Sequence, residues 1–379
     1  MMHCQNKLFS INENVHYLNC AYKAPLLKQA EKAGLDALIR ERNPYNLSVN
    51  DFFEVTDNIK SEFSTIISCH KDNIALMPST SYGFASVLNS IKANYKKAIT
   101  IENEFPSGYF ALKKWCELND NNLTVVNRNN DDAETWNKNI IEEINEQTAI
   151  VLLSSVHWMN GTKLSLKEIG DKCKKVGAFF IVDGTQSVGA IPINVSENNI
   201  DALICASYKW LFGPYSSALG YFSEKFKDGM PIEESWMNRT NAKQFSELTD
   251  YDMNYAPMAG RFNVGQTSNF VLNPVLLTGL KQINQWGVKN IYDYCHSLSS
   301  YFKLQCESMN ITFEDSNYSS PHLFSVGLPN EVNISELKNK LEKKNIYVSL
   351  RGDYLRVSLN VFNDKNDVEQ LANALKSIL

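Results

Sequence analysis

Short apolar runs alternate with longer segments of helical periodicity over the first two thirds of the chain. Runs of four or five apolar and β-branched residues, bounded by turn residues, predict buried strands. They occur at 74–77, 98–101, 123–126, 149–153, 179–182, 203–206 and 219–222. Helical segments such as 50–67 and 166–176 lie between most of them. This alternation predicts an α/β domain in which helices cover both faces of a mostly parallel central sheet.

The pattern changes near residue 271. Long helices are expected at 272–286 and 288–306, followed by shorter strands and helices at 323–326, 334–343, 346–349, 355–358 and 366–379. Such a mixture predicts a smaller α+β C-terminal domain. A chain of 379 residues is also longer than one core usually organises. We therefore expect an N-terminal arm, 1–16, that packs with the small domain, a large domain, 17–270, and a small domain, 271–379.

Composition excludes several classes of partner. The net charge is −5 and no basic run stands out, so neither nucleic acid nor an anionic membrane is an expected partner. The eight cysteines are scattered, which fits reduced thiols better than a disulfide framework. No apolar stretch approaches the ~20 residues of a membrane span, and the N-terminus lacks a signal core. We expect a cytoplasmic protein, and we predict no metal site.

Two of the predicted strands lead to ionisable residues. Asp183 follows the run at 179–182, and Lys209 follows the run at 203–206. Ligands of open parallel sheets bind beyond the carboxyl ends of strands, so both residues are expected to face one crevice. The aromatic neighbours of Lys209 imply burial, which lowers the pKa of the amine and makes it a better nucleophile. Pyridoxal phosphate (PLP) would use both groups, since its aldehyde forms a Schiff base with lysine and its ring nitrogen pairs with an acid.

The segments DGTQSVG at 183–189 and SYKWLFGP at 207–214 resemble the class V aminotransferase group of fold-type I PLP enzymes. That group includes cysteine desulfurases, kynureninases, and selenocysteine-lyase-like and isopenicillin-N-epimerase-like proteins. The resemblance covers nearly the whole chain, from Tyr17-Leu18-Asn19 to Arg356-Val357-Ser358. It implies that the large domain binds PLP, that the substrate is an amino acid, and that the protein is a homodimer with shared active sites.

The resemblance also assigns residues to the cofactor. For the ring these are Lys209 as the Schiff-base lysine, Asp183 as the partner of the ring nitrogen, Gln186 as the donor to the phenolic oxygen, and Phe105 as the stacked ring. For the phosphate they are Thr80, Ser81, Ser207 and Tyr208 of one subunit, and Gln266 and Thr267 of its neighbour. Independently, the turn at Thr80 and Ser81 joins a predicted strand to a helix, where hydroxyl and backbone N–H groups form an anion site.

Four further residues are assigned to the substrate. Arg356 matches the arginine that grips the α-carboxylate, which a planar guanidinium binds through two parallel hydrogen bonds. Arg351, five residues earlier, could read a distal group of the substrate. His157 and Trp158 follow another predicted strand and are expected near the crevice. Each assignment has a purely structural alternative, for example a surface ion pair for an arginine or a hydrogen-bonded core histidine for His157.

The chain departs from the desulfurase pattern at two places. Cysteine desulfurases carry a nucleophilic cysteine ahead of the arginine, whereas residues 346–356 read IYVSLRGDYLR, and they have histidine where Phe105 stands. Phenylalanine can stack but cannot move protons. The first hypothesis is therefore an aminotransferase-like enzyme that uses Lys209. The second is a C–S, C–Se or C–C lyase, such as a selenocysteine lyase or kynureninase, or an epimerase. The third is a non-catalytic PLP-binding regulatory protein.

Overall fold

The computed structural model describes residues 2–93, 96–129, 132–352 and 354–378. Within these residues, seven strands form the central sheet in the order β2-β8-β7-β6-β5-β3-β4. Their bounds are β2 Ile74–Met77, β3 Lys97–Ile101, β4 Asn122–Val126, β5 Thr148–Ser154, β6 Phe179–Asp183, β7 Ala202–Ala206 and β8 Ala218–Phe222. Of these strands, β8 runs antiparallel to both of its neighbours. The predicted mostly parallel sheet of a fold-type I domain is confirmed.

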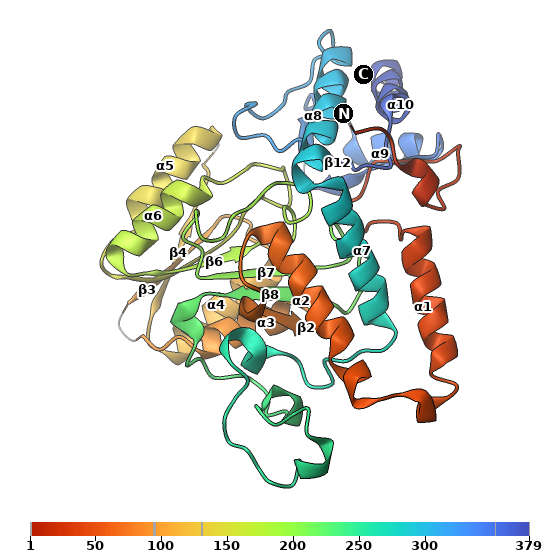
Figure 1. The fold of residues 1–379 in the computed structure, drawn as a ribbon. Coiled ribbons are helices and arrows are strands. Elements are labelled where there is room, and N and C mark those ends of the chain that lie inside the picture. The colour runs from red at the N-terminus through yellow and green to blue at the C-terminus, as the bar shows by residue number, and fades with distance from the viewer. Residues whose placement is uncertain (1, 94–95, 130–131, 353, 379) are drawn as a thin grey trace.

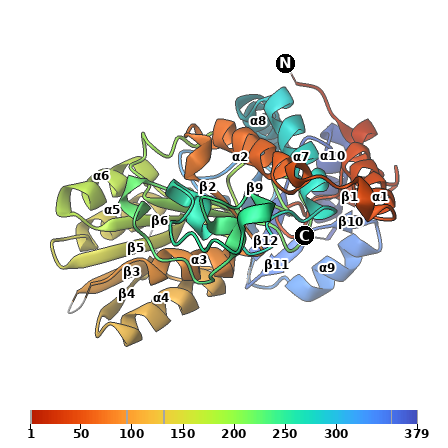
Figure 2. The same ribbon diagram turned by 60° about the horizontal axis from the view of Figure 1, so that its bottom comes forward.

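Helices cover both faces of this sheet (Figures 1 and 2). Successive side chains of β2 point to opposite faces of the sheet and join two different apolar clusters. Ile74 and Leu76 belong to one cluster, and Ala75 and Met77 belong to the other. A strand that is buried on both sides reads as a continuous apolar run, which is why strands such as β2, β5 and β7 were predictable. The helices of the large domain are α1 Lys28–Arg40, α2 Glu54–Ile67, α3 Thr80–Asn89, α4 Pro106–Leu118, α5 Ala133–Glu143 and α6 Leu166–Val176.

The C-terminal elements form a second, smaller unit at the top of Figure 1. Its helices are α8 Val288–Gln305, α9 Ile334–Glu342 and α10 Lys365–Ile378, and α7 Leu272–Trp286 leads into it along α1 and α2. Its strands are β9 Leu323–Gly327, β11 Ser349–Arg351 and β12 Tyr354–Ser358, an antiparallel sheet in the order β11-β12-β9. The strand predicted at 346–349 is divided, because β10 Ile346–Tyr347 pairs instead with β1 His16–Tyr17.

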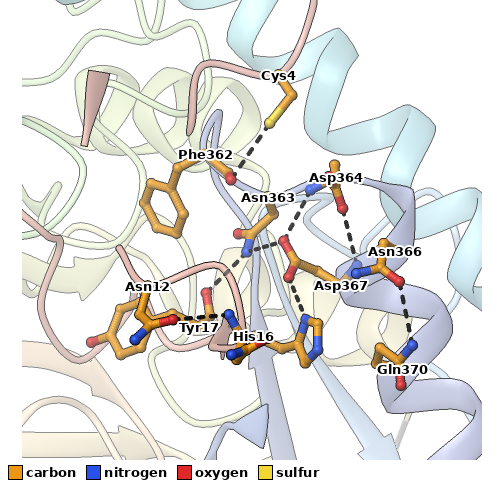
Figure 3. A network of polar contacts seen from close by, with 11 residues as sticks. Cys4, Asn12, His16, Tyr17, Phe362, Asn363, Asp364, Asn366, Asp367 and Gln370 are labelled. Carbon is orange, nitrogen blue, oxygen red and sulfur yellow. Dashed lines mark hydrogen bonds and ion pairs between the residues drawn. The ribbon is translucent and has the colours of Figure 1, made fainter. Parts of the chain in front are cut away.

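The N-terminal residues are held against the start of α10 and the segment that precedes it (Figure 3). His16 Nδ1 lies 2.8 Å from Asp367 Oδ1, and Asn363 donates to the Tyr17 carbonyl over 3.0 Å. The ring of Phe9 packs edge-on against Phe362 with 5.2 Å between centroids. Segments from opposite ends of the chain therefore build this part of the molecule together.

Topology brings several strand ends to one edge of the large sheet. The carboxyl ends of β3, β5, β6 and β7 meet there because these strands are parallel, and Ser154 pairs with Asp183 in the register. The antiparallel β8 begins at the same edge, and β2 ends there before α3. The segment between β8 and α7 projects from the body at the bottom of Figure 1.

Candidate active site

A cavity of about 280 Å³ opens at this edge of the sheet. The sequence-predicted residues that line it are Thr80, Ser81, Phe105, Trp158, Asp183, Gln186, Tyr208 and Lys209. They lie at or directly after the carboxyl ends of β2, β3, β5, β6 and β7. The fold thus gathers side chains separated by more than a hundred residues, as expected for the carboxyl ends of parallel strands.

Lys209 is buried, with 6% of its surface exposed. Its Nζ lies 5.8 Å from the centre of the Phe105 ring and 5.6 Å from that of Tyr208. Burial, and then repulsion by Arg356, lower the pKa of the amine to about 8, although Asp183 opposes the change. The neutral form, which a nucleophile or base requires, is therefore far more populated near neutral pH than in an exposed lysine.

The loop that carries Lys209 is closed by hydrogen bonds. Ser207 O accepts from Gly213 N over 2.9 Å, and the Ser207 hydroxyl donates to Pro214 O over 2.7 Å. A Cβ at position 213 would stand 2.6 Å from Ser207 Cβ, so this close approach needs glycine. The side chain of Ser207 therefore braces the lysine loop and does not line the cavity.

Asp183 ends β6 with 5% of its surface exposed. Its Oδ1 accepts a hydrogen bond from Thr185 N over 2.8 Å. Burial raises the pKa of this carboxyl, while the Thr185 hydrogen bonds and the charge of Lys209 act in the opposite direction. Thr185 lines the cavity as well, and its hydroxyl accepts from Ala206 N over 3.1 Å, which ties β6 to β7. Sequence reasoning missed Thr185, although it lies two residues after the acid.

Gln186 is held from two sides. Its Oε1 accepts from Trp210 Nε1 over 3.0 Å, and its Nε2 donates to Ala21 O over 3.3 Å. Its backbone carbonyl accepts from His322 Nε2 over 2.6 Å. The side-chain amide is thus fixed at the cavity wall by Trp210 and Ala21, and the backbone of Gln186 is held by His322 from the C-terminal part of the chain.

Hydroxyl groups gather at the N-terminus of α3. Ser79 caps the helix by accepting from Tyr82 N over 3.2 Å, and its Oγ lies 2.9 Å from Ser81 Oγ. Thr80 and Ser81 face the cavity at this terminus. The turn before β8 adds Tyr215, Ser216 and Ser217 to the cavity lining, which no sequence signal had indicated. A helix N-terminus surrounded by hydroxyls suits an anion.

Glu104 is a second buried carboxylate beside the cavity, and sequence reasoning missed it too. It accepts from Ser154 N and from Phe105 N, each over 2.6 Å, and from the Ser154 hydroxyl. Burial, and then the charge of Asp183, raise its pKa to about 7, although these hydrogen bonds oppose the rise. Glu104 thereby fixes the backbone on which the Phe105 ring stands. Its position directly before Phe105 is the only signal in the sequence.

Arg356 lies behind the cavity wall with 1% of its surface exposed. It donates to Trp158 O over 2.6 Å and to Ser349 Oγ over 3.3 Å, and Ser349 in turn donates to Asn19 Oδ1. Burial, and then the charge of Arg351, lower the pKa of Arg356 to about 9. Asn19 is a further residue whose role in holding this arginine the sequence did not reveal.

The remaining predicted residues lie away from this cavity. His157 is buried beside the ring of Trp136, with Nδ1 2.9 Å from Asn160 Oδ1, and it lines a separate cavity of about 540 Å³. Gln266 is exposed, and the Thr267 hydroxyl donates to Val264 O. Within one subunit, the fold does not bring His157, Gln266 or Thr267 to Lys209.

A model of the family described as Aminotransferase class-V matches residues 42–371. The chain belongs to the class-V aminotransferase family. It is accordingly a PLP-dependent transferase or lyase, which confirms the family, the enzyme class and the cofactor predicted from the sequence.

Individual relatives of this class-V chain are distant but cover most of its length. An uncharacterised aminotransferase of Bacillus subtilis, YcbU, is 24% identical over 328 residues, which are 86% of this chain and 83% of the relative. The kynureninase of Shouchella clausii is 23% identical over 316 residues, which are 77% of this chain and 73% of the relative. Among solved structures, the cystine C-S lyase C-DES superposes with a TM-score of 0.86 at 17% identity, covering 97% of this chain and 98% of the lyase. A variant of C-DES holds glycine linked covalently to PLP.

The cavity of this class-V enzyme fits PLP in three respects. Lys209 offers a buried amine for which the described residues provide no hydrogen-bond partner. Asp183 offers a buried carboxylate on the same cavity, and the α3 terminus offers hydroxyl and N–H donors for a phosphate. The described residues contain no cluster of three or more His, Cys, Asp or Glu side chains that could bind a metal ion. None of the described helices has the length and apolar character needed to span a bilayer.

Proposed function

We propose that this enzyme is an aminotransferase, which moves the amino group of an amino acid to the cofactor and then to a keto acid. The observation that carries the proposal is the position of Lys209. Among the described residues that line the cavity, it contributes the amine that can act as a base near neutral pH. One base on one face of the substrate suits the proton transfer that transamination requires, from the substrate Cα to the cofactor carbon on the other side of the amino nitrogen.

The residues that line the cavity, and Arg356 behind its wall, have distinct tasks in this proposal. When bound, PLP supplies a ring that withdraws electrons from the substrate Cα. Asp183 would hold a negative charge beside the ring nitrogen, and Phe105 would pack against the ring. Thr80, Ser81 and the α3 terminus bind the phosphate. The remaining residues would act on the substrate and the proton. Arg356 would bind the α-carboxylate, and Lys209 Nζ would take the proton from Cα and deliver it to the cofactor carbon bonded to the amino nitrogen.

A C–C lyase of the kynureninase kind is the second candidate. Phe105 with Pro106 and Ser107, together with Tyr208, resembles the kynureninase pattern, and several curated relatives are kynureninases. Persulfide chemistry has less support, because the cavity-lining residues among those described include no cysteine.

An amino acid panel tests the proposed reaction. With an amino acid and no keto acid, we expect one equivalent of keto product per active site and loss of the visible absorbance of the cofactor. Adding a keto acid should restore that absorbance. Continuous release of pyruvate, alanine or sulfide would instead establish a lyase, and an unchanged spectrum with every amino acid would contradict catalysis. Appearance of the D-amino acid alone would establish an epimerase.

We also propose that the enzyme is a homodimer in which Gln266 and Thr267 reach the neighbouring active site. In support, the outer face of α1 exposes apolar side chains, with Leu35 55%, Leu38 53% and Ile39 51% accessible. Such a cluster is typical of a protein–protein contact. We expect twice the mass of one chain in light scattering, and we expect Leu38→Asp to shift the protein toward monomers with weaker PLP binding. A wild-type monomer that binds PLP fully would contradict this proposal.

A further inference from the structure

We infer that the substrate is an amino acid with an acidic side chain and that Arg351 binds its second anionic group. This inference rests on the proposed function and adds the substrate class to it. The shared chemistry is a carboxylate, sulfinate or phosphate on the side chain, recognised by a guanidinium through two parallel hydrogen bonds.

The hairpin of β11 and β12 places two arginines on one face. Ser349 pairs with Arg356 and Arg351 pairs with Tyr354. Residues two apart on a strand, and residues directly opposite each other, share a face, so Arg351 and Arg356 point to the same side. Diagonal neighbours of this kind lie about 7–8 Å apart. The hairpin therefore offers two cationic groups to the same region.

Trp158 connects this pair to the cavity. Arg356 donates to its carbonyl over 2.6 Å, and the guanidinium carbon of Arg351 lies 5.6 Å from the centre of its ring. The Trp158 ring itself lines the cavity and packs edge-on against Phe105, with 5.6 Å between centroids. A substrate bound at Lys209 with its α-carboxylate toward Arg356 would thus extend its side chain along Trp158 toward Arg351.

Among the described residues, positive charge exceeds negative charge in this region. Neither Arg351 nor Arg356 forms an ion pair with an acid among the described residues, and the Nε atoms of both are buried without a hydrogen-bond partner. The charge of Arg351 contributes to the lowered pKa values of Arg356 and Lys209. Asp183 faces Lys209 from the other side of the cavity, and Glu104 is occupied by Ser154 and Phe105. Cations without counter-ions are costly where they are shielded from water. Arg356 is buried and Arg351 is partly buried, so this region favours an anionic ligand.

Separate anchors indicate two anionic groups and not one. Arg356 is held by Trp158 O and Ser349 Oγ, whereas Arg351 donates to Leu350 O over 2.7 Å at the tip of the hairpin. One carboxylate satisfies one guanidinium in the bidentate arrangement. The α-carboxylate would occupy Arg356, and Arg351 would keep its free donors for a second acid.

The test compares acidic substrates with neutral isosteres on the holoenzyme. The pairs are glutamate with glutamine and aspartate with asparagine, and cysteine sulfinate and phosphoserine test the other oxyacids. Consumption of amino acid is measured, so the comparison holds for a transferase and for a lyase. The wild type should favour one acidic member by about 10- to 100-fold in kcat/KM, the range of a hydrogen bond to a charged group. Arg351→Gln should bring this ratio near one and leave the neutral member almost unchanged, whereas Arg356→Gln should lower both members.

Binding of unreactive acids provides a readout that does not depend on turnover. In calorimetry, glutarate or succinate should bind the wild type about 10-fold or more tighter than valerate or butyrate, and Arg351→Gln should remove the difference. Arg351→Lys should retain part of it, and Lys225→Gln, which removes a distant charge, should retain all of it. The visible absorbance of the cofactor shows that each variant is folded. An equal loss for acidic and neutral members in Arg351→Gln, or no acid preference in the wild type, would overturn the inference. A lyase product with the acid preference intact would overturn the transaminase proposal alone.

Discussion

Replacing Lys209 with alanine should remove the visible absorbance of the bound cofactor and lower turnover by about 10⁴-fold, the upper range for a positioned acid–base group. Alanine has no amine to bond to the cofactor and none to move the Cα proton. Lys209→Arg should be equally inactive, because a guanidinium keeps its charge and its proton at all accessible pH values. The measurements are the absorbance spectrum after gel filtration and the single-turnover rate with the best substrate of the panel.

Lys225 provides the matched control. This lysine pairs with Asp201 over 2.9 Å and lies 5.1 Å from the Phe179 ring, at the opposite edge of the sheet. Lys225→Ala also loses one amine near an aromatic ring but should keep both the spectrum and the rate. A Lys209→Ala protein with the wild-type spectrum would contradict the assignment of Lys209.

The pH dependence of cofactor uptake gives the same prediction a second readout. Only the neutral amine can bond to an aldehyde, and the pKa of Lys209 is lowered from 10.5 to about 8. The rate at which apoenzyme gains the visible band should therefore rise about tenfold per pH unit below pH 8 and level off above it. A rate still rising at pH 10 would indicate an ordinary exposed lysine.

Most strands of the large domain could be predicted because they are buried on both faces and read as apolar runs, and the partly exposed edge strand β4 keeps an apolar and β-branched run. All seven runs correspond to strands of the sheet. The region 346–349 could not be divided correctly, because its first two residues pair with His16 and Tyr17 from the other end of the chain. Local pattern carries no information about a partner 330 residues away.

The residues of the candidate site also fall into those that the sequence could predict and those that it could not. Asp183 and Lys209 could be placed together because both follow parallel strands, and the family resemblance supplied Phe105, Gln186 and Thr80. Residues that hold others in place were missed. Asn19, for example, acts on Arg356 through Ser349, and this link joins segments far apart in the sequence. His157 was expected in the same crevice since it follows β5, but its ring turns toward Trp136 and Asn160.

Asp183→Asn should lower turnover by about 10²- to 10³-fold, the cost of removing one preorganised electrostatic partner, while Lys209 still binds the cofactor and the visible band persists. Asparagine can keep the hydrogen bond from Thr185 N, observed at 2.8 Å, because its Oδ1 also accepts. It cannot hold a negative charge beside the ring nitrogen. A lower turnover with an unchanged visible band would therefore result from loss of the negative charge. Turnover and the visible band are measured on the same sample. Asp183→Glu should recover part of the rate.

Asp201 is the matched control for this charge. It is also buried, with 8% of its surface exposed, and it also accepts from a backbone N–H, that of Phe180 over 2.9 Å. It precedes β7, however, and thus lies at the edge of the sheet opposite the cavity. Asp201→Asn should lower the melting temperature, because Lys225 loses its ion-pair partner, but should leave turnover per folded molecule unchanged. If Asp183→Asn behaved like Asp201→Asn, with altered stability and full turnover, Asp183 would be a structural carboxylate and the electronic role proposed for it would be wrong.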